Sequence, residues 1–323
     1  MPGPGNARAP VRRRIALAVM VLALAAVLAS STRRGSPVAS TTAADPATSA
    51  APATALGPVA PTEPAAPSPP APPPPPAVDP ATRLAVLTTV ADVAAQAGGT
   101  VQVAVRDAAG VEVLASPGAG TPVLTASLVK LLVVQQLFAR EAAGLITLSP
   151  ADLDLMQRAV TSSDDSAMSA LWSRFGGAEL VTAAAAEFGL SGSSPPQVAG
   201  QWGEAVTTAA DIALFLSTLG DHLAPEDLAT LTGWMRSTTG IATDGFDQRF
   251  GLLSPTVSAT TLSPVAAKQG WMCCIDRRRQ LHSIGTLTDG RTIALLGDFP
   301  LSTGWPRATA VLDQVAAVVT AAP

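Results

Sequence analysis

One short pattern in this sequence could perform nucleophilic acyl transfer. Ser127-Leu-Val-Lys130 places a hydroxyl and an amine three residues apart, and on a helix such residues share one face. The positive potential at a helix N-terminus would lower the pKa of the amine and stabilise an alkoxide. The same residues also fit an N-cap serine followed by an ordinary helical lysine. The spacing alone does not decide between these two readings.

Lysine is scarce elsewhere in the chain. There are 18 Arg but only two Lys, Lys130 and Lys268. Arginine does not deprotonate at working pH, whereas a lysine amine can be tuned to act as a base. One interpretation is that the two lysines mark positions that need an amine. The other is that they occur by chance in an Arg-rich composition. Two further polar motifs follow the first one, Thr161-Ser162-Ser163-Asp164-Asp165-Ser166 and Lys268-Gln269-Gly270-Trp271.

Composition excludes several classes of protein. The chain has 323 residues, 48% apolar and 14% charged, which is typical of a globular protein. Adjacent Cys273 and Cys274 exclude a disulfide framework and a Cys-based zinc ribbon. His222 and His282 lie far apart without nearby ligand patterns, which argues against a zinc site. Residues 78–323 carry 14 basic and 22 acidic side chains, a net charge of −8, and this argues against nucleic-acid binding.

Three segments of different composition divide the chain. Residues 1–34 contain an Arg-flanked apolar run from Ile15 to Ala29, which is short for a spanning helix and suits a signal peptide or a short signal anchor. No Cys ends this run, so no lipid anchor is expected there. Residues 35–77 are rich in Pro and Ala and predict an unpacked linker. Residues 78–323 are expected to be the folded domain, outside the cytoplasm.

The elements that must position the motifs change type along this domain. Helical patterns cover residues 80–97, 128–143, 207–219 and 306–320, and residues 150–190 are helical with loops. Strand patterns cover residues 100–106, 111–115, 269–274, 280–287 and 292–299. The order is helix, two strands, many helices, three strands, helix. Such segregated runs favour an α+β fold, a five-stranded antiparallel sheet built from both ends of the chain, flanked by helices and joined to an all-helical subdomain.

In this order the three motifs resemble those of the penicillin-recognising serine enzymes, the class A β-lactamases and DD-peptidases, which carry S-x-x-K, S-D-N and K-T-G. The resemblance covers about residues 80–323, and is strongest to exported serine hydrolases of actinobacteria. It implies an acyl-enzyme and no metal or organic cofactor. It also implies four catalytic roles: Ser127 as nucleophile, Lys130 as its base, Ser163 as proton donor to the leaving nitrogen, and Lys268 as the cation that sets the field and attracts a substrate carboxylate.

The resemblance further implies a substrate-binding strand. The backbone N–H groups of Ser127 and Trp271 would form an oxyanion hole, and Gly270 would let the strand come close to the substrate. Asp165 and Gln269 occupy the remaining substrate-facing motif positions. Asp164 is expected to hold the loop of the second motif.

Several residues depart from the family pattern. Asp165 replaces an amide with a carboxylate, which only accepts hydrogen bonds and could pair with Lys130 and weaken it as a base. Gln269 removes a hydroxyl that usually holds the substrate carboxylate, and Trp271 is bulky where the family is usually small. The segment between Lys130 and Ser163 is short, so part of one wall of the site is expected to be missing.

The largest departure from the family pattern concerns deacylation. Class A enzymes use a catalytic Glu on a long loop well before a Thr-Thr pair. In residues 190–206 the only acid is Glu204, three residues before Thr207, which is late for this role, while Gln197 and Gln201 cannot act as bases. We therefore expect slow hydrolysis of a penicilloyl-enzyme.

Other residues allow two readings each. Cys273 and Cys274 could form a vicinal disulfide or lie as buried thiols on opposite strand faces. Arg277, Arg278 and Arg279 could bind an anionic polymer or substrate, but a solvated turn is the simpler interpretation. His282 is more simply a packed strand residue than a carboxylate clamp. Trp172, Trp202, Trp234 and Trp305 are most simply core or loop anchors.

The sequence thus predicts an exported monomeric serine hydrolase acting on a peptidoglycan-type peptide, an ester or a β-lactam, with membrane contact only through its N-terminal segment. A catalytically degenerate cell-wall or partner-binding module is the first alternative, supported by Asp165, Gln269 and the missing loop Glu. A true class A β-lactamase with another deacylation base is the second.

Overall fold

The structure, a computed structural model, describes residues 78–260 and 264–322. The signal and linker predictions for residues 1–34 and 35–77 lie outside these residues. Within them, no helix has the length and apolar character needed to cross a membrane.

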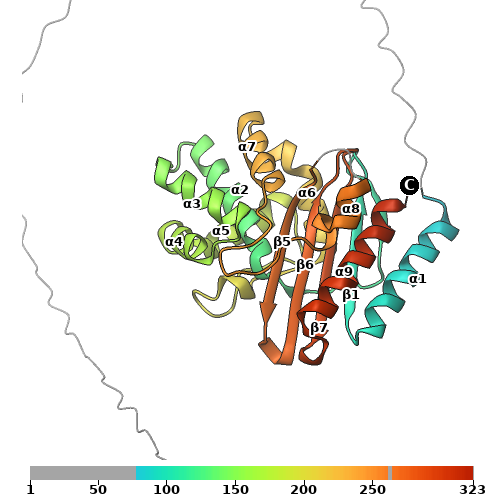
Figure 1. The fold of residues 1–323 in the computed structure, drawn as a ribbon. Helices are drawn as coiled ribbons and strands as arrows, with labels where there is room; N and C mark the ends of the chain where they lie inside the picture. The colour runs from blue at the N-terminus through green and yellow to red at the C-terminus, as the bar shows by residue number, and fades with distance from the viewer. Residues whose placement is uncertain (1–77, 261–263, 323) are drawn as a thin grey trace, which may run out of the picture. The chain divides into compact units, whose positions relative to one another are not determined.

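A five-stranded antiparallel sheet in the order β2-β1-β7-β6-β5 is the centre of the fold (Figure 1). Its strands are β1 (Thr100–Arg106), β2 (Glu112–Ala115), β5 (Ala266–Cys273), β6 (Arg278–Thr286) and β7 (Thr292–Pro300). β1 pairs with β7 from Thr100↔Asp298 to Arg106↔Thr292, so both ends of the domain build one sheet. This confirms the predicted α+β architecture. A second sheet pairs β3 (Val123–Leu124) with β4 (Val206–Thr207).

Two helices from opposite ends of the domain cover one face of the sheet (Figure 1). They are α1 (Pro80–Gln96) and α9 (Gly304–Ala321), with the short α8 (Pro255–Thr260) beside α9. Asp79 caps α1 by accepting from the N–H groups of Ala81 and Thr82, with Pro80 at its first position. Buried aliphatic residues of both helices form one core with β1, β6 and β7.

The helical subdomain covers the other face (Figure 1). It contains α2 (Val129–Ala142), α3 (Pro150–Thr161), α4 (Asp165–Phe175), α5 (Gly177–Phe188), α6 (Ala209–His222) and α7 (Pro225–Arg236). Every residue of α2 from Val129 to Phe138 is buried, so this helix is the core of the subdomain. The helical region with loops predicted for residues 150–190 is confirmed and comprises α3, α4 and α5. Two features differ from prediction, because α7 was not predicted and β5 begins three residues earlier.

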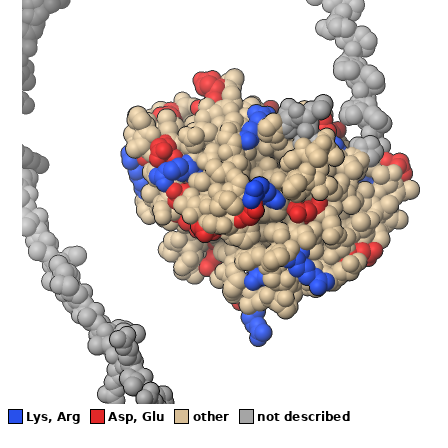
Figure 2. All heavy atoms as spheres, viewed as in Figure 1, with Lys and Arg blue, Asp and Glu red and all other residues tan. Residues whose placement is uncertain are grey.

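Charged side chains are few on the visible face of the domain, and both signs are interspersed there (Figure 2). This face therefore presents no continuous basic patch of the kind that phosphate backbones require.

Candidate active site

The candidate nucleophile lies where a short 3-10 helix leads into α2. This 3-10 helix spans Ala126–Leu128, so Ser127 lies two residues before the first residue of α2 instead of in its first turn as expected. Ala126 has φ 47°, a left-handed conformation that is costly for a residue with a side chain and is often found at functional sites. Ser127 is 5% exposed and lines a cavity of about 390 Å³.

Lys130 is fully buried and faces the second motif. Its Nζ donates to the carbonyl oxygen of Ser163 at 2.6 Å, to Ser163 Oγ at 3.2 Å and to Asp165 Oδ1 at 2.7 Å. These three contacts do not include Ser127 Oγ, which makes no hydrogen bond to any described residue. Burial lowers the pKa of Lys130 below its ordinary value, and the charges of Asp165, Asp164 and Asp244 partly offset this.

The hydroxyl of Ser163 lies between the two lysines. Lys268 Nζ donates to Ser163 Oγ at 2.8 Å and to the carbonyl oxygen of Gln269 at 2.8 Å. Ser163 has φ 53°, so its strained backbone conformation is held where both amines meet its side chain. Burial, and then the positive charge of Lys130, lower the pKa of Lys268 well below its ordinary value. A serine flanked in this way can pass a proton between two amines and a leaving group.

Asp164 positions this serine. Its Oδ1 accepts from the N–H groups of Ser166 and Ala167, which caps α4. Its Oδ2 pairs with Arg158 of α3. Burial acts to raise the pKa of Asp164, but the hydrogen bond from Ala167 N–H and the charge of Arg158 hold it below its ordinary value. The structure thus gives Asp164 the structural role expected from the sequence, and Arg158 is a partner that sequence reasoning missed.

On β5, alternate side chains point to opposite faces. Lys268 faces Ser163, whereas Gln269 Nε2 donates to the carbonyl oxygens of Gln248 and Phe250 at 3.1 and 2.6 Å. The Gln269 side chain is fully buried, so the expectation that it contacts substrate is corrected. A Cβ on Gly270 would lie only 3.2 Å from Leu128 Cγ, which explains why the strand carries glycine beside the nucleophile.

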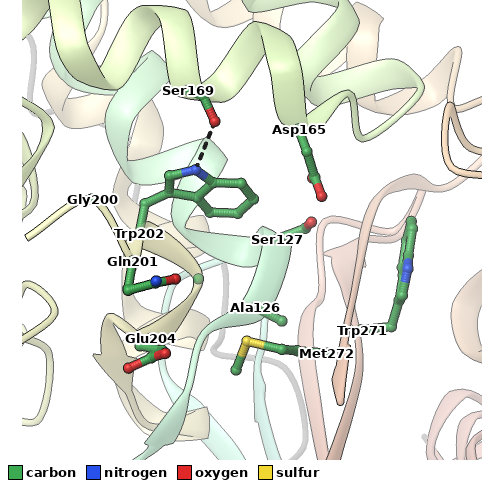
Figure 3. Close-up of a pocket in the computed structure, with 11 residues that line it drawn as sticks. Ala126, Ser127, Asp165, Ser169, Gly200, Gln201, Trp202, Glu204, Trp271 and Met272 are labelled. Atoms are coloured by element: carbon green, nitrogen blue, oxygen red, sulfur yellow. Dashed lines mark hydrogen bonds between the residues drawn. The ribbon is translucent and has the colours of Figure 1, made fainter. Parts of the chain in front are cut away.

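Two indole rings border the cavity on either side of Ser127 (Figure 3). Trp271 donates from Nε1 to Asp244 at 2.9 Å and stacks on Phe246 with ring centroids 4.7 Å apart. Trp202 donates from Nε1 to Ser169 Oγ at 3.2 Å. Lys130 Nζ lies 5.0 Å from the centre of the Trp202 ring. Trp202 is therefore a wall of the site and not merely a loop anchor.

Ser169, Gln201, Glu204 and Met272 complete the side chains that line this cavity beyond the predicted residues. Ser169 was missed, although it follows Asp165 by four residues on α4 and so shares its helix face. Glu204, judged too late in the sequence, does reach the cavity wall. Its carboxylate lies at the opposite end from the Ser127 hydroxyl, which points toward Asp165 (Figure 3).

His282 and the three arginines at 277–279, discussed above from the sequence, do not line the cavity. His282 is fully buried with Nε2 2.9 Å from the carbonyl oxygen of Leu124, and burial lowers its pKa to about 4. Arg278 pairs with Asp298, and Arg279 lies 4.3 Å from the Trp305 ring centre. Only Arg277 of the three arginines is exposed, so the solvated-turn interpretation fits that residue alone.

Cys273 and Cys274 are joined by a disulfide. Of the two readings left open by the sequence, the structure therefore has the vicinal bridge. It lies at the end of β5, directly after Met272 in the cavity wall.

In the part of the chain that the structure describes, no three His, Cys, Asp or Glu side chains are grouped so that they could hold a metal ion.

Comparison of the sequence with known proteins finds relatives in mycobacteria. No known protein-family profile matches the chain. It is 37% identical over 187 residues to "Putative lipoprotein LppW" of Mycobacterium tuberculosis and of Mycobacterium bovis, a match that covers 57% of this chain. The chain spans only 58% of the length of these curated relatives.

Comparison of the structure with solved structures gives a consistent group. A β-lactamase from Chitinophaga pinensis aligns with TM-score 0.58 and 15% identity, covering 73% of this chain and 98% of its own. The class A β-lactamase of the last common ancestor of Gram-negative bacteria gives TM-score 0.56 and 21% identity, covering 74% and 99%. The protein PBP-A gives 0.57 and 17%, covering 73% and 94%. This chain therefore has the fold of the class A β-lactamases and PBP-A, the penicillin-recognising serine hydrolase fold.

Proposed function

We propose that this chain is an extracytoplasmic serine hydrolase that forms an acyl-enzyme on Ser127. The observation that carries the proposal is the Ser163 hydroxyl held between the amines of Lys130 and Lys268, at 3.2 and 2.8 Å, next to an unpartnered serine in a cavity wall. Burying two lysine amines costs free energy, and a role in catalysis would account for their retention at these positions. A structure described as PBP-A in acyl-enzyme complex with penicillin G has the same fold.

In the proposed reaction, Ser127 Oγ attacks the carbonyl carbon of the substrate and its proton passes to the free amine of Lys130. The bond to the leaving group then breaks, and the leaving atom takes the proton of Ser163, which the lysines replace. Water finally cleaves the Ser127 ester to give a carboxylic acid and the free serine. Lys130 must turn toward Ser127 for the first step, and catalytic hydrogen bonds often tighten only when substrate is bound.

Deacylation of a β-lactam adduct is proposed to be slow. The Glu204 carboxylate lies at the far end of the cavity from Ser127 (Figure 3), so it is poorly placed to activate water at the acyl group. This favours small esters or amides, or peptidoglycan-type peptides, over fast penicillin hydrolysis.

An envelope location follows from two features. The relatives at 37% identity are described as a lipoprotein, and residues 1–34 have the Arg-flanked apolar run of an export signal. We propose that residues 35–77 form a linker and residues 78–323 the hydrolase domain, acting as a monomer.

Labelling with a fluorophosphonate probe tests this function. The Ser127 oxygen would attack phosphorus and fluoride would leave, so we expect covalent labelling that maps to Ser127 and is abolished by Ser127→Ala. Ser173→Ala, which changes an exposed serine of α4, is the matched control and should label normally.

A degenerate binding module is the second candidate, favoured by the ion pair between Lys130 and Asp165. It predicts no labelling of Ser127 under conditions in which the folded domain is intact. Labelling that depends on Ser127 excludes it.

A further inference from the structure

The charges that face the cavity have one sign only. Among the side chains that line it, Asp165 and Glu204 are the only ionisable ones. Both lysines next to it are 0% exposed, so neither can meet a substrate charge directly. Asp244, which accepts from Trp271 Nε1 at 2.9 Å, is a third carboxylate near the site but does not line the cavity. Ser127 itself is 5% exposed, unpartnered and aimed into the same space, which marks the cavity as the place where a ligand must lie.

Asp165 has one carboxylate oxygen available for a ligand. Oδ1 accepts from Lys130 Nζ at 2.7 Å, whereas Oδ2 has no partner among the described residues. The side chain is 63% exposed and points into the mouth of the cavity beside Ser127 (Figure 3). A carboxylate oxygen only accepts hydrogen bonds, so the substrate group opposite it must be a donor. When Lys130 acts as a free-amine base, Asp165 also loses its cationic partner.

Aromatic side chains form the walls of the cavity beside Ser127 (Figure 3). The indole rings of Trp202 and Trp271 flank Ser127 and are fixed by hydrogen bonds from their Nε1 atoms. Each ring already has a lysine amine near it, because Lys130 Nζ lies 5.0 Å from the centre of Trp202 and Lys268 Nζ lies 5.9 Å from the centre of Trp271. The rings therefore serve as walls, and the preference for a cation rests on Asp165.

Binding of an anion is poorly supported. Gln269 directs its amide to Gln248 and Phe250 instead of the cavity. His282 is fully buried and uncharged at neutral pH because burial lowers its pKa to about 4. A substrate carboxylate would therefore lie among carboxylates, with no exposed cation in the cavity lining.

We propose that the acyl donor of this enzyme carries an ammonium or guanidinium group, recognised by Asp165 Oδ2 between the two indole rings. This rests on the proposed function and names its substrate class. Asp165 is then the residue that sets specificity by charge.

Three esters of equal length test the proposal. They are p-nitrophenyl ε-aminohexanoate, p-nitrophenyl heptanoate and mono-p-nitrophenyl pimelate, which end in an ammonium, a methyl and a carboxylate group. For the wild-type chain, after subtraction of the Ser127→Ala rate, we expect kcat/KM for the ammonium ester to exceed that for the methyl ester by about tenfold, as expected for about 1.4 kcal/mol. The carboxylate ester should be the poorest substrate.

The variant Asp165→Asn should bring the ammonium-to-methyl ratio close to one. Any change in the basicity of Lys130 affects both esters equally and cancels in this ratio, and the methyl ester also reports whether the variant is folded and active. Asp92→Asn, on the exposed side of α1, should keep the wild-type ratio. A wild-type ratio of one or less, or a ratio that Asp165→Asn leaves unchanged, would overturn the proposal.

Failure of the proposed function gives a different result. In that case none of the three esters is cleaved above the Ser127→Ala rate and the fluorophosphonate probe leaves Ser127 unlabelled, so the substrate class proposed here fails with it. If Ser127 is needed for cleavage but kcat/KM does not depend on the charge at the end of the ester, the proposed substrate class is wrong and the proposed function stands.

Discussion

Lys130 donates to Asp165 across 2.7 Å, from a side chain that is 0% exposed to one that is 63% exposed. The lysine therefore has no contact with water, while its counter-ion does. This pair is the main departure from the arrangement that the motifs imply, because it stabilises the protonated and catalytically inactive form of the base.

Asp165→Asn should shift the acid limb of the pH–rate profile to lower pH. Removing the carboxylate removes the largest influence that raises the pKa of Lys130, while burial continues to lower it. A larger fraction of the lysine is then a free amine at any pH on the limb. For a neutral ester, kcat/KM on the limb should rise severalfold, as roughly expected for a pair with one exposed partner. An acid limb that stays at the same pH, or moves to higher pH, would show that Lys130 is not the base.

Glu204→Gln should change the lifetime of a penicilloyl-enzyme by less than about threefold. Removal of a working general base costs about 10²- to 10⁴-fold, and the carboxylate lies at the far end of the cavity from Ser127 (Figure 3). The lifetime is measured by intact mass after excess penicillin is removed. Fast turnover in the wild type that Glu204→Gln abolishes would identify this residue as the deacylation base.

His282 should make the fold sensitive to acid. Its pKa is lowered to about 4 in the folded state and is about 6.5 in an unfolded chain. Below about pH 6.5 His282 binds a proton in the unfolded chain but stays neutral in the folded chain. The free energy of unfolding therefore falls as the pH drops from about 6.5 to about 4, by about 3 kcal/mol in total.

Urea unfolding at a series of pH values measures this effect. His282→Gln keeps a donor for the Leu124 carbonyl and should flatten the slope in this window, with His222→Gln as the control. The same slope in wild type and His282→Gln would exclude His282 as its cause.

Sequence reasoning reached the fold because apolar periodicity reveals which segments pack. The apolar and β-branched residues at positions 100–106 and 292–299 predicted the strands that pair as β1 and β7. α7 was missed, although Pro225 and two acids mark its first turn. The resemblance of the three motifs to those of the penicillin-recognising enzymes implied which residues meet at Ser163, and Lys130, Asp165 and Lys268 do lie within hydrogen-bond reach of it or of one another.

Other features of the site depend on the three-dimensional course of loops, which short stretches of sequence do not reveal. Glu204 and Trp202 reach the cavity because the segment before β4 folds against Ala126 and Met272. The orientation of Gln269 was accessible in principle. Side chains alternate along a strand, so Lys268 facing the site already places Gln269 on the opposite face.

The vicinal disulfide predicts a simple mass difference. The purified chain should be two hydrogens lighter than the same chain after reduction and should contain no titratable thiol, because Cys273 and Cys274 are the only cysteines. Two free thiols in the unreduced chain would contradict the bridge.

The most direct test of the account is the intact mass of the chain during reaction with p-nitrophenyl heptanoate. We expect one heptanoyl group on wild type, mapped to Ser127 by peptide analysis, together with release of p-nitrophenol. Ser127→Ala should carry none, and Ser173→Ala should behave as wild type. Absence of both an adduct and p-nitrophenol release in the folded wild-type chain, or equal acylation of Ser127→Ala, would contradict the claim that Ser127 is the nucleophile.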